Sequence, residues 1–290
     1  MKSILLIVLV ILGLSCFGQT GSEILLFDMK VKKGQIVLSN PENITNHKGY
    51  DNQPSFHPDQ PLIYYSSFDD SSRSDIKYYN YKIKKTSSLT ITREREYSPT
   101  VTPEGKFVSC IIQRDNGAQD LGKYPILGGL PEILINNLKV GYHVWATKSK
   151  LLLFVLGDSN TNILHYYNLV DKSDSIIAKN IGRSLHKIPG QNAMSFIQKI
   201  SEKEGLIQKL DLATGAISTI MTILQGQDHI AWLQNNILLS GNGTKLFSFQ
   251  VGVDKEWQLV MIEGDVSIVK GITRLVTNAG NTKLAVVVSE

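Results

Sequence analysis

Cysteine is scarce in this chain, with two residues in 290. Cys16 lies in the N-terminal apolar segment, so Cys110 is the single cysteine of the remaining chain. One thiol forms no intramolecular disulfide, which excludes a small extracellular fold stapled by disulfides. The remaining ~270 residues suffice for a large core without such help. Because Cys110 lies in a β-rich run, we expect its thiol to be buried in the second strand of its repeat.

The sequence also lacks an apolar run long enough to cross a membrane. The N-terminal run, Ile4 to Leu14, follows Lys2 and precedes small residues, whereas a spanning helix needs about 20 apolar residues. This order is typical of a secretory signal peptide over residues 1–18, so we expect a periplasmic or secreted protein. Lipoprotein cleavage before an acylated Cys16 is the alternative. The ending Phe17-Gly18-Gln19 resembles those of exported Bacteroidetes proteins.

Dense blocks of one charge are missing as well. The formal net charge is +4, and the basic stretches 82–85 and 92–95 are both interrupted. We therefore expect no nucleic-acid partner. Gly-x-Ser-x-Gly, His-Glu-x-x-His and paired-cysteine metal motifs are absent, and no segment has a useful helical period. These absences favour an all-β chain without a recognisable catalytic signature.

What the sequence does contain is a repeat. Pro54 to Asp59 and Pro99 to Glu104 share the pattern Pro-x-apolar-x-Pro-acid, and each precedes an apolar β-rich run. Weaker copies follow at steps of 42 to 45 residues. The equivalent positions that we assign are Phe56, Val101, Trp145, Lys187, Trp232 and Leu275. Six copies of this length, with short apolar runs flanking polar turns, predict a six-bladed β-propeller of four-stranded blades.

The two ends of the chain predict how the ring closes. After Leu275 there is room only for a hairpin that ends at Glu290. Before Phe56, Glu23 to Met29 and Gln35 to Ser39 form two strands without a hairpin of their own. We expect these N-terminal strands to complete the C-terminal blade, which leaves no exposed edge, and residues 22–290 to form a single domain.

The two proline-rich segments, residues 54–59 and 99–105, resemble the WD40-like repeats of TolB-type propellers. The resemblance covers nearly all of residues 22–290 and is strongest in the first two blades and the last. It implies a periplasmic or secreted propeller. It does not imply TolB's own partner, because TolB carries an extra N-terminal domain for which we expect no room here.

In a propeller, the first strand of each blade lines a central channel, and the loops that lead into these strands form one mouth. We therefore expect a ligand site at that mouth. Asp51, Asn52 and Thr273 belong to these loops. The candidate ligand-binding residues are Glu96, Tyr97, Tyr142, His143, Arg183, His186, Asp228, His229 and Arg274.

Three of the candidates are evenly spaced histidines, since 43 residues separate His143 from His186 and His186 from His229. Blade symmetry would place equal offsets at equal heights, so we expect at least two imidazoles to face the channel. They could hold a transition metal, or one could act as a general base. The alternative is that each caps a strand or bonds a neighbouring blade. We expect no metal or other cofactor.

The two arginines have their own alternatives. Arg183 and Arg274 could clamp a carboxylate or phosphate, or form inter-blade ion pairs with Glu96 or Asp228. The favoured function is a non-enzymatic, monomeric binding or interaction module that takes a small molecule, a glycan or a protein at the channel mouth. The rival is a channel-centred hydrolase or lyase acting on a sugar or small ester, with or without a metal.

Overall fold

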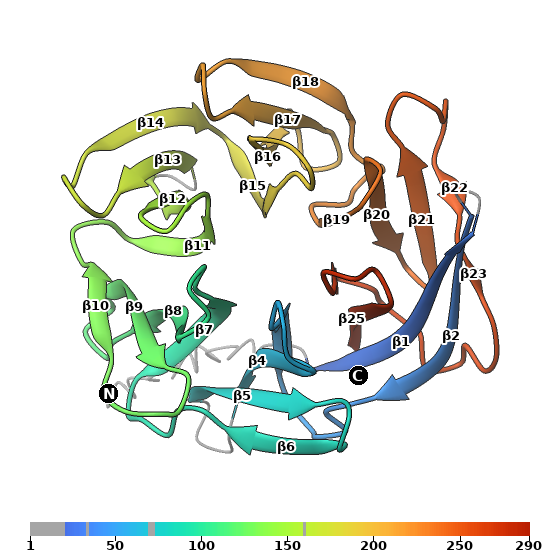
Figure 1. Ribbon diagram of the computed structural model, residues 1–290, viewed down its shortest axis with the longest axis horizontal. Coiled ribbons are helices and arrows are strands. Elements are labelled where there is room, and N and C mark those ends of the chain that lie inside the picture. The colour runs from blue at the N-terminus through green and yellow to red at the C-terminus, as the bar shows by residue number, and fades with distance from the viewer. Residues whose placement is uncertain (1–20, 33–34, 69–72, 159–160) are drawn as a thin grey trace, which may run out of the picture.

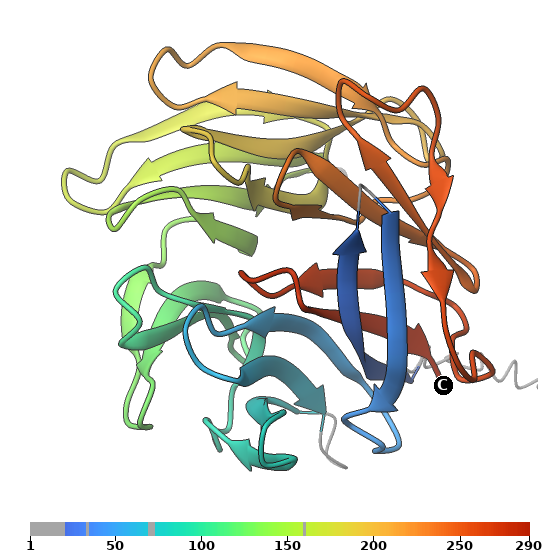
Figure 2. The same ribbon diagram turned by 45° about the vertical axis from the view of Figure 1, so that its right-hand side comes forward.

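The computed structural model describes residues 21–32, 35–68, 73–158 and 161–290. The expected signal peptide and Cys16 lie outside the described residues. Six sheets stand around a central axis like the blades of a propeller (Figures 1 and 2). The predicted all-β, six-bladed fold is confirmed. Nowhere in the described ranges is there a helix long and apolar enough to cross a membrane.

The first three blades follow one another along the chain, each as four antiparallel strands. Blade 1 contains β3 (Asp51–Phe56), β4 (Leu62–Phe68), β5 (Ser74–Asn80) and β6 (Lys85–Ser88). Blade 2 contains β7 (Arg95–Val101), β8 (Phe107–Gln113), β9 (Gln119–Pro125) and β10 (Glu132–Ile135). Blade 3 contains β11 (Val140–Trp145), β12 (Lys150–Leu156), β13 (Asn162–Asn168) and β14 (Asp174–Lys179).

The next two blades repeat this order. Blade 4 contains β15 (Ile181–Lys187), β16 (Ala193–Lys199), β17 (Gly205–Asp211) and β18 (Ile217–Thr222). Blade 5 contains β19 (Ile230–Leu233), β20 (Ile237–Asn242), β21 (Lys245–Gln250) and β22 (Gln258–Leu259). In each blade the first strand is the innermost one and lies beside the channel (Figure 1).

Blade 6 joins the two ends of the chain. It contains β24 (Arg274–Thr277), β25 (Lys283–Ser289), β1 (Ser22–Lys32) and β2 (Gln35–Asn43). β1 pairs antiparallel with β25, with Leu25 opposite Val286. The short strand β23 (Met261–Ile262) then pairs in parallel with β2, which ties the end of blade 5 to the outer edge of blade 6 (Figure 2). The predicted closure by the N-terminal strands is confirmed.

The register identifies which residues are equivalent between blades. Phe56, Val101, Trp145, Lys187 and Trp232 each lie opposite the second residue of the following strand. In blade 6 this position belongs to Thr277, which lies opposite Leu284, and not to Leu275. The sequence assignment for the sixth repeat was therefore wrong by two residues. An even shift keeps the same face of a strand, so the pattern of apolar residues concealed it.

The core is divided among the gaps between blades. Each of six clusters of buried apolar side chains contains residues from two adjacent blades. In β1, Leu25 and Phe27 face blade 5, whereas Ile24 and Leu26 face blade 1. Both faces of a blade are thus apolar, which explains why its central strands read as continuous apolar runs.

Cys110 lies in β8, the second strand of blade 2, and is fully buried, as predicted. It packs in the cluster between blades 1 and 2, beside Val108 and Tyr124. Burial raises the pKa of the thiol well above its usual value. Both effects suppress the thiolate that reacts with alkylating reagents.

Removing the aromatic ring of Phe27 tests whether β1 is an integral part of the ring. Phe27 is fully buried between blades 5 and 6, so Phe27→Ala should lower the free energy of unfolding by about 3–5 kcal/mol. Val31 is 38% exposed on the same strand, and Val31→Ala should cost less than about 0.5 kcal/mol. Guanidinium unfolding of both variants measures the difference. Equal unfolding midpoints of the two variants would contradict the closure of the ring by β1.

Thiol labelling tests the burial of Cys110. In the native protein, a disulfide reagent should modify Cys110 at least 100-fold more slowly than in guanidinium, because reaction requires the blades to separate. The rate is followed by absorbance of the released thiolate, and the denatured protein is the control. Labelling of the native protein as fast as that of the denatured one would show the thiol to be accessible.

Candidate functional site

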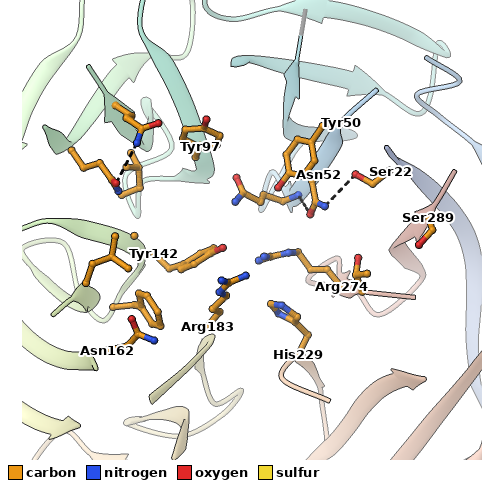
Figure 3. Close-up of a pocket in the computed structure, with 18 of the residues that line it drawn as sticks. Ser22, Tyr50, Asn52, Tyr97, Tyr142, Asn162, Arg183, His229, Arg274 and Ser289 are labelled. Carbon is orange, nitrogen blue, oxygen red and sulfur yellow. Dashed lines mark hydrogen bonds between the residues drawn. The ribbon is translucent and has the colours of Figure 1, made fainter. Parts of the chain in front are cut away.

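A cavity of about 700 Å³ opens at one end of the central channel (Figure 3). Every blade contributes side chains to its wall. One representative from each, in order from blade 1 to blade 6, is Tyr50, Tyr97, Tyr142, Arg183, His229 and Arg274. The wall is therefore assembled from residues far apart in the sequence, which the ring brings together at its axis. We call this space the mouth cavity.

A second cavity of about 200 Å³ continues from the first along the channel. Five residues line both spaces: Gln53, Tyr142, Arg183, His229 and Arg274. These residues form the boundary between the two cavities, and we call them the arginine layer. Beyond it, the inner cavity is lined by residues further along the innermost strands, such as His143, His186 and Val276.

The two guanidinium groups of the arginine layer lie close to the same aromatic ring, that of Tyr142 (Figure 3). The central carbon of Arg274 lies 5.3 Å from the ring centre of Tyr142, and that of Arg183 lies 6.0 Å from it. These distances are within the range of cation–π attraction. Neither guanidinium forms a hydrogen bond or an ion pair with any residue in the described part of the chain. The arginine layer thus presents two cations without a carboxylate partner.

Two residues with a strained backbone lie in the channel wall formed by blades 1 and 2. Gln53 and Ser98 occupy equivalent positions before Pro54 and Pro99, and both have a positive φ, of 59° and 54°. Each lies at a β-bulge of its innermost strand. The N–H of Ser98 donates to Oε1 of Gln53 over 2.6 Å, and this bond links blades 1 and 2. Bulges of this kind re-aim side chains at functional sites.

The three histidines all line the inner cavity, but they do not occupy equivalent positions. His143 lies opposite Leu153, the fourth residue of its neighbouring strand, whereas His186 lies opposite Ser195, the third residue. His229 precedes β19 and lines both cavities. The equal sequence spacing therefore does not correspond to equal heights, because the bulges differ between blades.

The imidazoles are held in their neutral form. Burial lowers the pKa of His143 to about 3. Burial and the charge of Arg274 lower the pKa of His186 to about 4. The pKa of His229 lies well below its usual value because of burial and then the charges of Arg274 and Arg183. Neutral imidazoles add hydrogen-bonding capacity to the channel without adding charge.

Two of the histidines bond to serines. The Oγ of Ser109 lies 2.7 Å from Nε2 of His143 and also accepts a hydrogen bond from the indole of Trp145 over 2.9 Å. This contact joins blade 3 to blade 2. The Oγ of Ser184 lies 2.7 Å from Nε2 of His186, two residues further along β15.

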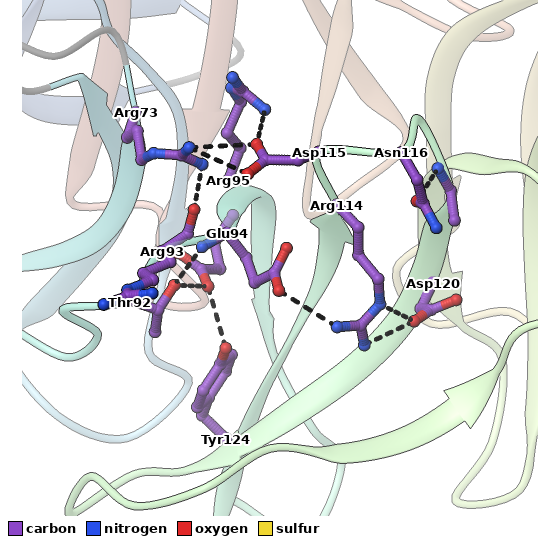
Figure 4. Close-up of polar contacts among 12 residues, drawn as sticks. Arg73, Thr92, Arg93, Glu94, Arg95, Arg114, Asp115, Asn116, Asp120 and Tyr124 are labelled. Carbon is purple, nitrogen blue, oxygen red and sulfur yellow. Dashed lines mark hydrogen bonds and ion pairs between the residues drawn. The ribbon is translucent and has the colours of Figure 1, made fainter.

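Glu96 does not lie at the channel mouth, so its expected placement is corrected. Its side chain is fully buried between blades 1 and 2. Thr92 and Tyr124 donate hydrogen bonds to Oε1 over 2.7 and 2.9 Å, and Figure 4 shows both donors close together. Burial raises the pKa of Glu96 to about 7 although these donors lower it. A strand alternates its faces, so Tyr97, the next residue, lines the mouth cavity instead.

Asp228 also lies outside the linings of both cavities. Its carboxylate packs on the backbone of Gly182, where a Cβ atom would collide with Oδ1, and it lies 3.8 Å from Nζ of Lys199. Burial raises the pKa of Asp228, whereas Lys199 and then the backbone of Arg183 lower it. Asp228 therefore supports the strand that carries Arg183 from behind.

The rim of blade 2 shows how arginines pair elsewhere in the chain. Arg114 contacts Asp120 over 2.8 Å and Glu94 over 3.3 Å (Figure 4). Arg95 contacts Asp115 over 3.4 Å. Asp115 is exposed and Arg95 is partly exposed, and an ion pair at such a position contributes little to stability.

One expectation from the sequence was that the three histidines could hold a transition metal. Among the described residues, no three His, Cys, Asp or Glu side chains are close enough together to hold a metal ion. The expected absence of a cofactor stays a prediction.

Several lining residues were not anticipated from the sequence. Gln113 and Gln119 reach the mouth cavity from the ends of the second and third strands of blade 2, and Asn162 reaches it from the third strand of blade 3. The repeat pattern identifies only the loops before innermost strands, so it misses such hairpin ends. Tyr50 and Gln53 directly flank Asp51-Asn52, and widening that window by one residue on each side would have found them.

Acidification should destabilise this fold through the buried histidines. His143 and His186 have folded-state pKa values of about 3 and about 4 against 6.5, so below pH 6.5 the unfolded chain binds protons that the folded chain does not. Their contribution to the free energy of unfolding is complete above pH 6.5. Below that pH it falls by on the order of 1 kcal/mol for each histidine with every pH unit of acidification. Glu96, whose pKa rises from 4.5 to about 7, has the opposite sign between pH 7 and 4.5.

Unfolding by guanidinium at pH 7, 6 and 5 measures the balance, in which the lowered pKa of His229 adds to the effect of the other two histidines and the raised pKa of Asp228 adds to that of Glu96. His143→Asn should flatten the loss of stability on acidification, whereas Glu96→Gln should steepen it. A wild-type free energy of unfolding that is unchanged between pH 7 and 5 would show that the histidines are not held neutral.

No family model matches the chain, and no curated protein gives a significant sequence match. Among solved structures, the chain is similar to TolB from Acinetobacter baumannii, with a TM-score of 0.58 and 11% identity over 92% of this chain. The match covers 63% of the Acinetobacter protein. It is also similar to a putative TolB from Agrobacterium tumefaciens, with a TM-score of 0.68 and 9% identity, covering 94% of this chain and 99% of that one. The chain therefore has the fold of the TolB-like six-bladed β-propellers.

Proposed function

We propose that this protein is a non-enzymatic binding module that acts outside the cytoplasm and takes its ligand in the mouth cavity. The observation that carries the proposal is the mouth cavity itself, a space of about 700 Å³ to which every blade contributes polar or aromatic side chains. Ligand pockets of this size combine apolar walls with a few polar groups that orient the ligand. The ligand is a small molecule, a glycan or a segment of a protein.

Two further features support the proposal. The N-terminal residues 1–18 have the pattern of an export signal, which favours the periplasm or the exterior as the place of action. Two similar solved structures are a TolB and a putative TolB, and the shared fold is compatible with an interaction module.

The serine–histidine contacts favour binding over hydrolysis. A catalytic serine needs access to substrate and a histidine oriented by a third group. Ser109 is fully buried, and its Oγ already donates to the carbonyl of Thr100 and accepts from Trp145. Nδ1 of His143 has no hydrogen-bond partner among the described residues. These contacts join blades and leave the hydroxyl without a free path to a substrate.

A blocking variant tests the proposal. Thr273 is exposed and lines the mouth cavity, so Thr273→Trp should fill part of it. Ser218, exposed on the outermost strand of blade 4, provides the matched control Ser218→Trp. The melting temperature is measured with a panel of sugars, sugar acids, amino acids, nucleotides and short peptides. A ligand at 100-fold its Kd stabilises the fold by about 2.7 kcal/mol, which raises the melting temperature by several degrees.

We expect at least one compound to stabilise the wild type and Ser218→Trp but not Thr273→Trp. Mass spectrometry of the compound after incubation with the protein should show it unchanged. Conversion of the compound would favour the hydrolase or lyase instead. Equal stabilisation of Thr273→Trp, or a panel without any stabilising compound, would contradict binding in the mouth cavity.

A further inference from the structure

We infer that the ligand of the mouth cavity carries an oxyanion, a carboxylate or a phosphate, which Arg183 and Arg274 hold together at the arginine layer. This inference rests on the proposed binding function and specifies the chemical class of the ligand.

The first step is the charge of the cavity walls. Among the described residues, Arg183 and Arg274 are the charged side chains that line the mouth and inner cavities, and no aspartate or glutamate lines either space. Arg95 and Arg114, by contrast, each contact a carboxylate at the rim of blade 2. The channel therefore presents two cations, Arg183 exposed and Arg274 half-buried, without a bonded anion.

The second step is the energy of that arrangement. Two like charges beside one ring repel each other, and attraction to the ring of Tyr142 offsets part of that repulsion. Asp228 attracts both arginines from behind Gly182 but bonds to neither guanidinium. An oxyanion between the guanidinium groups would relieve the repulsion and accept charge-assisted hydrogen bonds from their planar forks.

The third step is the chemistry of the neighbouring groups. Oε1 of Gln53 accepts hydrogen bonds from Ser98 and Ser66, which orients its Nε2 as a donor; no described group accepts from that Nε2. Burial raises the pKa of Tyr50 to about 12, so its hydroxyl stays a donor. The ring nitrogens of His229 also have no hydrogen-bond partner in the described chain. A site rich in donors and free of carboxylates suits an acceptor-rich anion.

The fourth step is the position of the arginine layer between the two cavities. An oxyanion there would leave the larger mouth cavity, with Tyr97 and Phe154 in its wall, for the rest of the ligand. The inner cavity, of about 200 Å³, is the smaller of the two spaces and lies on the far side of the arginine layer. The geometry thus favours a ligand that enters with its charged end first.

The experiment uses inorganic phosphate and citrate as probes, each compared with chloride at equal ionic strength. The double variant R183Q/R274Q removes both charges, and R183K/R274K keeps the charges without the planar forks. The control is R93Q, because Arg93 is exposed and lies outside both cavities. Melting temperatures are measured by scanning calorimetry, and the affinity of any compound found with the panel by titration calorimetry.

We expect phosphate or citrate to raise the melting temperature of the wild type and of R93Q, whereas the shift disappears in R183Q/R274Q and shrinks in R183K/R274K. A shift with phosphate alone indicates a phosphate ligand, and a shift with citrate alone indicates a carboxylate ligand. In chloride alone, R183Q should melt about 2 °C higher than the wild type because one of two repelling cations is gone. A panel ligand should lose at least 100-fold in affinity in the double glutamine variant.

Three results would overturn the inference: no anion-specific shift in the wild type, the same shift in R183Q/R274Q, or a lower melting temperature of R183Q in chloride. If a panel ligand binds R183Q/R274Q as tightly as the wild type but fails to bind T273W, the oxyanion inference fails and the proposed function stands. If T273W binds it as the wild type does, the proposed function fails.

Discussion

Apolar packing between neighbouring blades is the interaction on which the rest of this structure depends. A blade buries both of its faces, and each of the six buried clusters draws side chains from two blades. No blade can bury its surface alone, so stability belongs to the closed ring rather than to its parts. The pairing of β1 with β25 is therefore as important to the first blade as to the last.

Polar contacts refine this packing at the channel. Trp145 donates to Ser109 across blades 2 and 3, and Trp232 donates to Ser195 across blades 4 and 5 in the same way. The bulge at Gln53 reaches across to Ser98 in the next blade. Such bonds link neighbouring blades beside the channel. Strain at Gln53 persists because packing on both sides over-determines the backbone there.

The same confinement governs the electrostatics of the axis. Burial favours the neutral form of a titratable group, so it raises the pKa of Glu96 and lowers the pKa of His143. Arg183 and Arg274 bring two guanidinium groups to the same channel, and neither pairs with a carboxylate of the described chain. The channel consequently keeps its positive charge while its other polar groups are neutral. An anion is the species that such an environment favours, since no described carboxylate reaches the arginine layer.

The sequence alone determined the number of blades, the closure of the ring and the burial of Cys110, because these follow from a repeat length, complementary ends and apolar alternation. It also placed Tyr97, Tyr142, Arg183, His229 and Arg274 among the residues near the channel, and these side chains line the mouth cavity. Only the tertiary structure decided the face of Glu96, the heights of the three histidines, and the role of Thr277 in place of Leu275. The physical reason is that a strand reverses its side chains at every residue, so one bulge or one slip moves a group from channel to core without altering the spacing of the repeat.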